Sequence, residues 1–286
     1  MNLSASFYIF LLVVICALFY DCRQPRTGCL NILSPNFDVE AEEPCDDCCD
    51  SSEIQLSFIH RINLDTQEIS MQLNRLFEIF PNPEYGISVQ HFHFYLTDVQ
   101  FLRTDGQTST GAGQTIIETD PVTVLQNNHL YIARNIFGET NFGRFEQSGS
   151  IEKMQFNLGL TEENNSIIPD SLSGTDHPFR WQTDSLNWRE SDQYVFLRME
   201  YFEYLDSIIV DSMPSVIDIT SPDLQPIEID ANFDLDIGLN TFVTLKMDYN
   251  VLWADIDFEN DSKETIKSQI LQNISAAISF DNVNQE

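Results

Sequence analysis

The sequence is poor in basic residues: Lys and Arg together number 14, against 45 Asp and Glu, which gives a net charge of −31. A surface with so little positive charge repels phosphate backbones, and this excludes nucleic-acid binding. The acids are spread along the chain instead of forming one tail, as is typical of a solvated surface that attracts cations.

The sequence also lacks the motifs of common enzyme classes. It has no Gly-x-Ser-x-Gly and no His-Glu-x-x-His, and no cysteine follows Cys49. Gly111-Ala-Gly113 lacks the Lys and the helix that follow the glycines of a phosphate-binding loop. We therefore predict that the protein is not an enzyme.

One uncharged apolar run, residues 7–20, is too short for a membrane-spanning helix, which needs about 20 residues. Its length and position predict the hydrophobic region of a secretory signal peptide over residues 1–21. Cys22 follows at the position where a bacterial lipoprotein carries its lipid. We therefore predict a lipoprotein of the cell envelope, periplasmic or on the cell surface, with membrane lipid bound through Cys22. Plain secretion and a retained N-terminal anchor are the alternatives.

Residues 22–53 are short of large apolar residues and rich in acid, Pro and Cys, and we interpret them as a tether. Because an exported chain meets an oxidising compartment, the even set of four cysteines in this tether predicts two local disulfides. Four cysteines allow three pairings, and the spacing does not choose among them. A zinc site is the alternative. The four residues are Cys29, Cys45, Cys48 and Cys49.

A string within the tether resembles a short cysteine-bounded motif of secreted and surface proteins of some bacteria. It reads Gly28-Cys-Leu, then Asn36-Phe-Asp38, Ala41 and Cys45. The resemblance implies a location in the cell envelope or outside the cell.

Residues 54–286 are predicted to form one all-β domain. Stretches of alternating β-branched and aromatic residues, separated by turn residues, favour a β-sandwich or barrel-like fold of mostly antiparallel strands. One helix is predicted near the C-terminus and packed on the sheet, with Asp261 as N-cap and Glu264 three positions on. Its apolar stripe recurs every four residues, at Ile266, Ile270, Ile274 and Ile278.

Residues 89–102 (VQHFHFYLTDVQFL) carry the candidate metal ligands. Their two-residue period predicts a strand, whose successive side chains point to opposite faces. His91 and His93 therefore share one face with Tyr95, with Cα atoms about 6–7 Å apart, close enough to bind one ion. Imidazole suits copper, zinc, nickel or iron. The alternative is a solvated strand face.

A third ligand would complete such a site. We predict His129 for this position. Further candidates are His60, His177, Met154 and Met199.

Three segments in this order resemble the MbnP-like copper-binding domain of bacterial envelope proteins, over residues 54–280. They are residues 94–102 (FYLTDVQFL), residues 154–160 (MQFNLGL) and the stretch that runs from Asp176-His-Pro178 through Trp188 to residues 194–200 (YVFLRME). Three positions depart from the family pattern: Thr161 replaces an Asp, Gln193 a Gly, and Tyr201 a Gly.

The resemblance implies copper handling outside the cytoplasm, for acquisition or buffering, without catalysis. In some members of that family, histidines and an oxidatively modified tryptophan form the copper site, and a dihaem peroxidase-like partner makes the modification. Trp188 matches the motif tryptophan and is the candidate for modification. A cell-surface structural or interaction module without metal is the alternative function.

Overall fold

The structure, a computed structural model, describes residues 24–50, 52–64, 67–79, 82–110, 117–119, 123–125, 131–133, 139–143, 147–169, 188–189, 193–220, 225–236 and 238–286. The chain divides into two compact units, Met1–Asp50 and Ser51–Glu286. We call the described part of the first, residues 24–50, the N-terminal unit, and we call the second the β domain.

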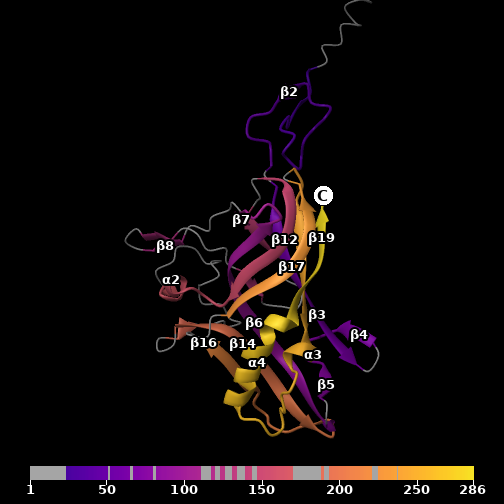
Figure 1. The fold of residues 1–286 in the computed structure, drawn as a ribbon, viewed down its shortest axis with the longest axis vertical. Coiled ribbons are helices and arrows are strands. Elements are labelled where there is room, and N and C mark those ends of the chain that lie inside the picture. Colours follow the sequence, from indigo (N-terminus) through magenta and orange to yellow (C-terminus); the bar gives the residue numbers. More distant parts are fainter. Residues whose placement is uncertain are drawn as a thin grey trace, which may run out of the picture. The chain divides into compact units, whose positions relative to one another are not determined.

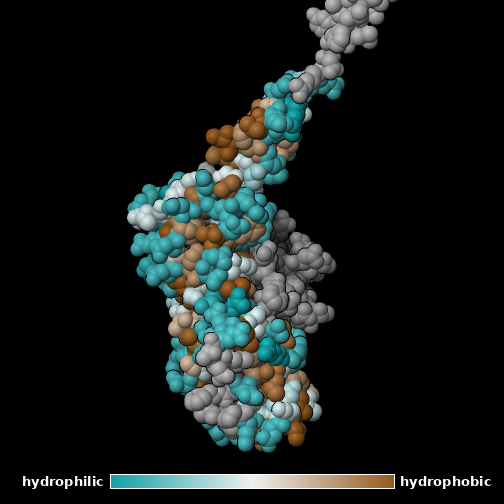
Figure 2. Space-filling model, turned by 90° about the vertical axis from the view of Figure 1, so that its right-hand side faces the viewer, coloured by the Kyte–Doolittle hydropathy of each residue, from teal (hydrophilic) through white to brown (hydrophobic). Residues whose placement is uncertain are grey.

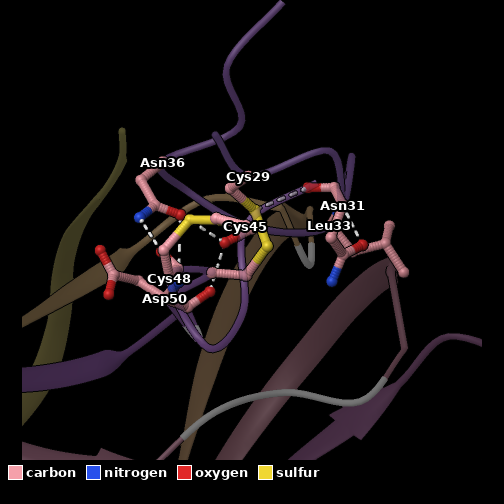
Figure 3. Close-up of a disulfide and its surroundings, with 9 residues drawn as sticks. Cys29, Asn31, Leu33, Asn36, Cys45, Cys48 and Asp50 are labelled. Carbon is pink, nitrogen blue, oxygen red and sulfur yellow. Dashed lines mark hydrogen bonds between the residues drawn. A yellow bond between two sulfur atoms is a disulfide. The ribbon is translucent and has the colours of Figure 1, made fainter. Parts of the chain in front are cut away.

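Two disulfides hold the N-terminal unit together (Figure 3): Cys29 is bonded to Cys49, and Cys45 to Cys48. The prediction of two local disulfides is confirmed. Because all four sulfur atoms are paired with one another, they leave no thiolate for zinc, and the zinc alternative is wrong. Beside the disulfides, the short strands β1 (Thr27–Gly28) and β2 (Glu43–Pro44) pair in parallel.

The remaining motif residues of the N-terminal unit have structural roles. Gly28 lies where a Cβ atom would be 2.8 Å from a carboxylate oxygen of Asp38 and 3.0 Å from the Ala41 Cβ, so a larger residue would require both neighbours to shift. The Asn36 side chain accepts a hydrogen bond from the backbone N–H of Asp50 (3.0 Å) and donates one to the carbonyl of Cys48 (2.8 Å). These contacts join the middle of the unit to its C-terminal end.

In the β domain, the larger sheet is built on the 22-residue strand β6 (Asn82–Arg103) (Figure 1). The first half of β6 pairs with β14 (Gln193–Leu205) and the second half with β12 (Gly149–Leu158). Outside these, β16 (Ser215–Thr220) pairs with β14, and β17 (Gln225–Leu235) pairs with β12. Shorter strands of this sheet are β5 (Leu76–Ile79), β7 (Thr108–Thr110), β10 (Tyr131–Ala133), β13 (Trp188–Arg189) and β15 (Ile208–Ile209).

The second sheet joins the two ends of the β domain. Strand β3 (Ile54–Leu64) pairs in parallel with β18 (Thr241–Asp248), and paired residues such as Ser57 and Thr244 are 187 positions apart in sequence. Strand β19 (Ile278–Gln285) pairs antiparallel with β18. The sheet is completed by β4 (Gln67–Ser70) and β11 (Glu139–Gly143), and β8 (Ile117–Thr119) pairs separately with β9 (Thr123–Leu125).

Aromatic side chains from both sheets meet in one core. The ring of Phe58 on β3 lies edge-on to Phe94 on β6, with centroids 5.2 Å apart. Phe233 on β17 stacks on Phe280 of β19 at 5.8 Å. Contacts of this kind form where two sheets pack face to face. The prediction of an all-β, sandwich-like domain is therefore confirmed.

The predicted C-terminal helix is α4 (Lys263–Ala277), and it contacts β16, β17 and β18. Ile266, Ile270 and Ile274 are buried, as the four-residue repeat predicts. Two details of the prediction are wrong. Ser262 caps the helix by accepting a hydrogen bond from the Thr265 N–H, whereas the Asp261 carboxylate accepts one from the Asp257 N–H. Ile278 begins β19 instead of extending the helix.

Two single-turn helices, α2 (Glu162–Asn165) and α3 (Tyr249–Leu252), complete the described secondary structure. No helix in the described ranges combines the length and the apolar run that crossing a bilayer requires.

Gly159 joins β12 to α2 and has a positive φ of 114°. A Cβ atom there would lie 2.5 Å from the ring of Phe196, so the chain and the ring are in close contact. The residue also anchors the loop, because its N–H donates to the Tyr95 carbonyl (2.8 Å) and its carbonyl accepts from the Thr97 hydroxyl (2.9 Å).

We predict that Gly159→Ala destabilises the β domain by roughly 2–4 kcal/mol, because it combines a strained φ with a clash against Phe196. The matched control is Gly106→Ala, at a positive φ of 80° with open space around it. It should cost only about 1–2 kcal/mol of backbone strain. Urea unfolding measures the loss of stability in each variant. Equal losses in the two variants would show that the Phe196 ring moves aside without cost.

Candidate metal centre

Strand pairing gathers a row of polar side chains on one face of the larger sheet. In the antiparallel ladder of β6 and β14, His91 lies opposite Glu200 and His93 opposite Arg198. In the next ladder, Asp218 of β16 lies opposite Arg198. Residues directly opposite in a ladder share a face, so these five side chains form one continuous row. We call it the histidine row.

The two imidazoles of the histidine row are neighbours. Their ring centroids are 5.6 Å apart, and the ring planes are nearly perpendicular, at 84°. The side chain of His91 is 47% exposed, whereas His93 is only 2% exposed. One ring is thus open to solvent, and the other is fixed within the domain.

Carboxylates hold the guanidinium of Arg198 beside these rings. Arg198 donates to both oxygens of Asp218, at 2.8 and 3.0 Å, and lies 3.6 Å from Glu200. The hydrogen bonds with Asp218 raise the pKa of Arg198 above its usual value. Because two carboxylates offset one guanidinium, the row has no excess of positive charge to repel a cation.

The separation of the two rings is compatible with a shared metal ion. Two imidazoles that bind one ion at about 2.0–2.1 Å have centroids roughly 4.5–6.5 Å apart, depending on the angle between them. The observed 5.6 Å lies within that range. A carboxylate oxygen of Glu200 is 4.0 Å from His91 Nε2, which is beyond hydrogen-bond distance but places a negative charge beside the exposed ring.

The structure does not complete the coordination. Within the residues that it describes, no group of three or more His, Cys, Asp or Glu is arranged to hold a metal ion. The predicted third ligand, His129, lies outside the described residues, as do His177 and Cys22. The backbone of Trp188 is described, in β13 opposite Tyr194, but its side chain is not.

The sulfur candidates lie away from the histidine row. Met199 lies opposite Phe92 in the ladder of β6 and β14, on the core face, and it is fully buried. Met154 is also fully buried, opposite Phe101 of β6 and Ile229 of β17. Neither thioether is a donor that the structure brings to the two imidazoles.

His60 belongs to a different environment from His91 and His93. It lies on β3, its ring is 6.4 Å from that of Phe92, and its Nδ1 is 2.9 Å from the Tyr249 hydroxyl. Phe92 faces the core between the two sheets, opposite in direction to its neighbours His91 and His93. The suggestion that His60 approaches the pair is therefore wrong.

Burial sets the chemistry of His60. The side chain is 2% exposed, and desolvation lowers its pKa to about 4. Its Nε2 has no hydrogen-bond partner among the described residues, so a proton added there would leave a charge unpaired in the core. Burial also raises the pKa of its partner Tyr249. The pair is therefore a neutral element of the core.

Sequence reasoning missed Arg198, Glu200 and Asp218. The alternation of residues 194–200 indicates that Arg198 and Glu200 share a strand face. The alternation does not indicate which strand lies beside β14. The position of Arg198 and Glu200 next to the histidines depends on the register of β14 against β6, which the sequence does not give.

A disulfide-bonded unit followed by a two-sheet β domain with a histidine pair on a sheet face defines an extracytoplasmic protein with a candidate metal centre. The family model of MbnP matches residues 51–270, and the chain therefore belongs to the MbnP family, which confirms the resemblance. No curated protein matches. Among solved structures, MbnP from Methylosinus trichosporium is similar at a TM-score of 0.41 and 9% identity, over 73% of this chain and 79% of that chain.

The lowered pKa of His60 predicts a pH-dependent stability. Between pH 6.5 and 4 the unfolded chain takes up a proton that the folded chain does not. The contribution of neutral His60 is therefore fully present above pH 6.5 and is lost as the pH falls to 4, by up to about 3 kcal/mol. The variant His60→Asn keeps a group at the position of Nδ1 and removes the titration.

Comparing the free energy of unfolding of the two proteins at several pH values isolates His60 from the many acids, which titrate in both. The difference in the free energy of unfolding between the parent and His60→Asn should become smaller as the pH falls from 7 to 4. The control is Asn63→Gln on the same strand β3, which removes no titratable side chain, so its difference from the parent should stay constant. Parallel curves for His60→Asn and the parent would contradict burial of a neutral imidazole.

Proposed function

We propose that this chain binds copper outside the cytoplasm, for acquisition or buffering and without catalysis, with His91 and His93 as ligands. The observation that carries the proposal is the pair of rings 5.6 Å apart on one strand face, one of them open to solvent. Imidazole nitrogen is a preferred donor for copper. Membership of a family linked to copper-related systems supports that metal over zinc or nickel.

The surroundings of the pair also support cation binding. Glu200 lies beside the exposed ring, and the net charge of −31 attracts cations to the surface. We propose His129 as the third ligand. Since a rigid strand fixes the first two donors before an ion arrives, little ordering is left to the binding step.

We further propose that the mature protein is a lipoprotein, anchored through Cys22 after removal of residues 1–21. By family resemblance, we propose a dihaem peroxidase-like partner that oxidises Trp188. Peptide mass mapping of the native protein tests both modifications, as an acyl chain on Cys22 and as added oxygen on Trp188.

A second candidate function, a cell-surface interaction module without metal, is favoured by one hairpin. Asp206 and Ser207 both have positive φ, the geometry of a tight turn that joins β14 to β15. The rigid hairpin displays large apolar side chains to solvent, and such a surface is typical of protein–protein contacts. They are Leu205, Ile208, Ile209, Val210 and Met213.

Metal analysis separates the two candidates. We predict that the purified mature protein retains about one equivalent of copper, and that replacing both His91 and His93 with Ala weakens binding by more than about 100-fold. Glu200→Gln should weaken copper binding about tenfold, because it removes a negative charge that lies beside His91. Copper titration monitored by a competing chelator measures each change.

The control for the copper titration is His60→Asn, which removes an imidazole from the core and should leave copper affinity unchanged. A parent protein that is folded and binds no copper would contradict the metal proposal and favour the interaction module. Equal loss of copper in His60→Asn and in the double variant would place the ion elsewhere.

A further inference from the structure

The N-terminal unit exposes many large apolar side chains for its size. Within residues 30–39, five such side chains are open to solvent, up to 73% for Ile32 and 82% for Val39. Figure 2 shows hydrophobic side chains gathered on one side of this unit, which is the unit that contains β2 in Figure 1. We call the five residues the apolar face: Leu30, Ile32, Leu33, Phe37 and Val39.

Disulfides and backbone hydrogen bonds fix the shape of the apolar face. The Asp38 N–H donates to the Cys29 carbonyl (2.8 Å), and the Leu33 N–H donates to the Asn31 side chain (3.1 Å). The Cys29–Cys49 disulfide fixes the base of the same loop. Because these bonds do not depend on packing of the apolar side chains, the side chains remain available for contact with something else.

The acids that alternate with Phe37 and Val39 are paired. Asp38 lies 3.1 Å from Arg26, and Glu40 also contacts that guanidinium. The carboxylates beside the apolar face are thus partly neutralised by a residue of the same unit. Burying the apolar face therefore removes less uncompensated charge from water than two unpaired carboxylates would carry.

The position of the unit in the chain indicates what covers the apolar face. Cys22 lies two residues before Gln24, where the described chain begins, and two residues span at most about 7 Å. The inference that follows rests on the lipid anchor of the proposed function. A unit joined so closely to an acyl chain is held at the membrane surface, where exposed Ile, Leu and Val side chains partition into the interface.

Charge argues against other occupants. A second copy of this chain also carries −31, and two such surfaces repel each other. The N-terminal unit itself has seven acidic residues and one basic residue, Arg26, so anionic headgroups are unfavourable as well. We propose that the apolar face of the N-terminal unit inserts into the surface of a zwitterionic lipid membrane, as a second membrane contact beside the acyl chain on Cys22.

The test is co-sedimentation of the mature chain, with Cys22→Ser to remove acylation, with phosphatidylcholine vesicles. The parent should bind, and the triple variant Ile32→Ser, Leu33→Ser, Val39→Ser should bind at least about tenfold more weakly, because three exposed apolar side chains are lost. Adding phosphatidylglycerol to the vesicles should weaken binding. A free-thiol assay in denaturant shows that both disulfides of the variant have formed.

The matched control is Ile208→Ser, Val210→Ser, Met213→Ser, which removes three equally exposed side chains from the β14–β15 hairpin of the β domain. It should bind vesicles within about twofold of the parent. Absence of parent binding, equal weakening by the two triple variants, or stronger binding to anionic vesicles would each overturn the proposal. Mass spectrometry of the native N-terminus tests the acyl chain separately, so failure of the anchor and failure of the apolar face are distinguishable.

Discussion

The antiparallel pairing of β6 with β14 decides both the packing of the β domain and the composition of its candidate metal centre. In this ladder Phe92 is opposite Met199 on the core face, and His91 is opposite Glu200 on the other. A shift of one residue would exchange the two faces and move the histidines into contact with the second sheet. The apolar side chains between the sheets oppose such a shift, since it would bury charged groups and expose aromatic ones. The geometry of the histidine row is therefore stabilised by the hydrophobic core behind it.

The two histidine environments show how strongly the local surroundings determine the use of one side chain. His60 contacts aromatic rings and a tyrosine hydroxyl in the dry interior, where desolvation keeps it neutral. His91 and His93 lie among charged groups on the opposite side of the sheet, and one of them reaches solvent. Neutral imidazole binds metals in either place, but only the second place has an adjacent imidazole and an approach from water.

Much of this arrangement could be predicted from local patterns. The two-residue alternation of residues 89–102 was sufficient to predict that His91 and His93 share a face, and the isoleucine repeat was sufficient to predict the buried side of α4.

Features that depend on distant partners could not be predicted. Nothing in the alternation of β14 shows that Arg198 lies beside His93, because the register depends on bulges such as the one between Glu200 and Tyr201. The disulfide pairing of the N-terminal unit and the core position of His60 were inaccessible for the same reason. The predicted helix cap is wrong by one residue, because Asp261 and Ser262 are both good N-cap residues. The Asp261 carboxylate accepts a hydrogen bond from the Asp257 N–H instead, and Ser262 caps the helix.

The parallel pairing of β3 with β18 has a consequence for how the domain acquires its structure. The first long strand of the β domain has its parallel partner 187 residues later, so the second sheet cannot close until nearly the whole polypeptide has left the ribosome. Long-range pairing of this kind makes folding slow, because the entropy of closing a long loop is lost before the contacts form. The second sheet of a nascent chain therefore stays incomplete for most of its synthesis, and it closes only after β18 and β19 have emerged.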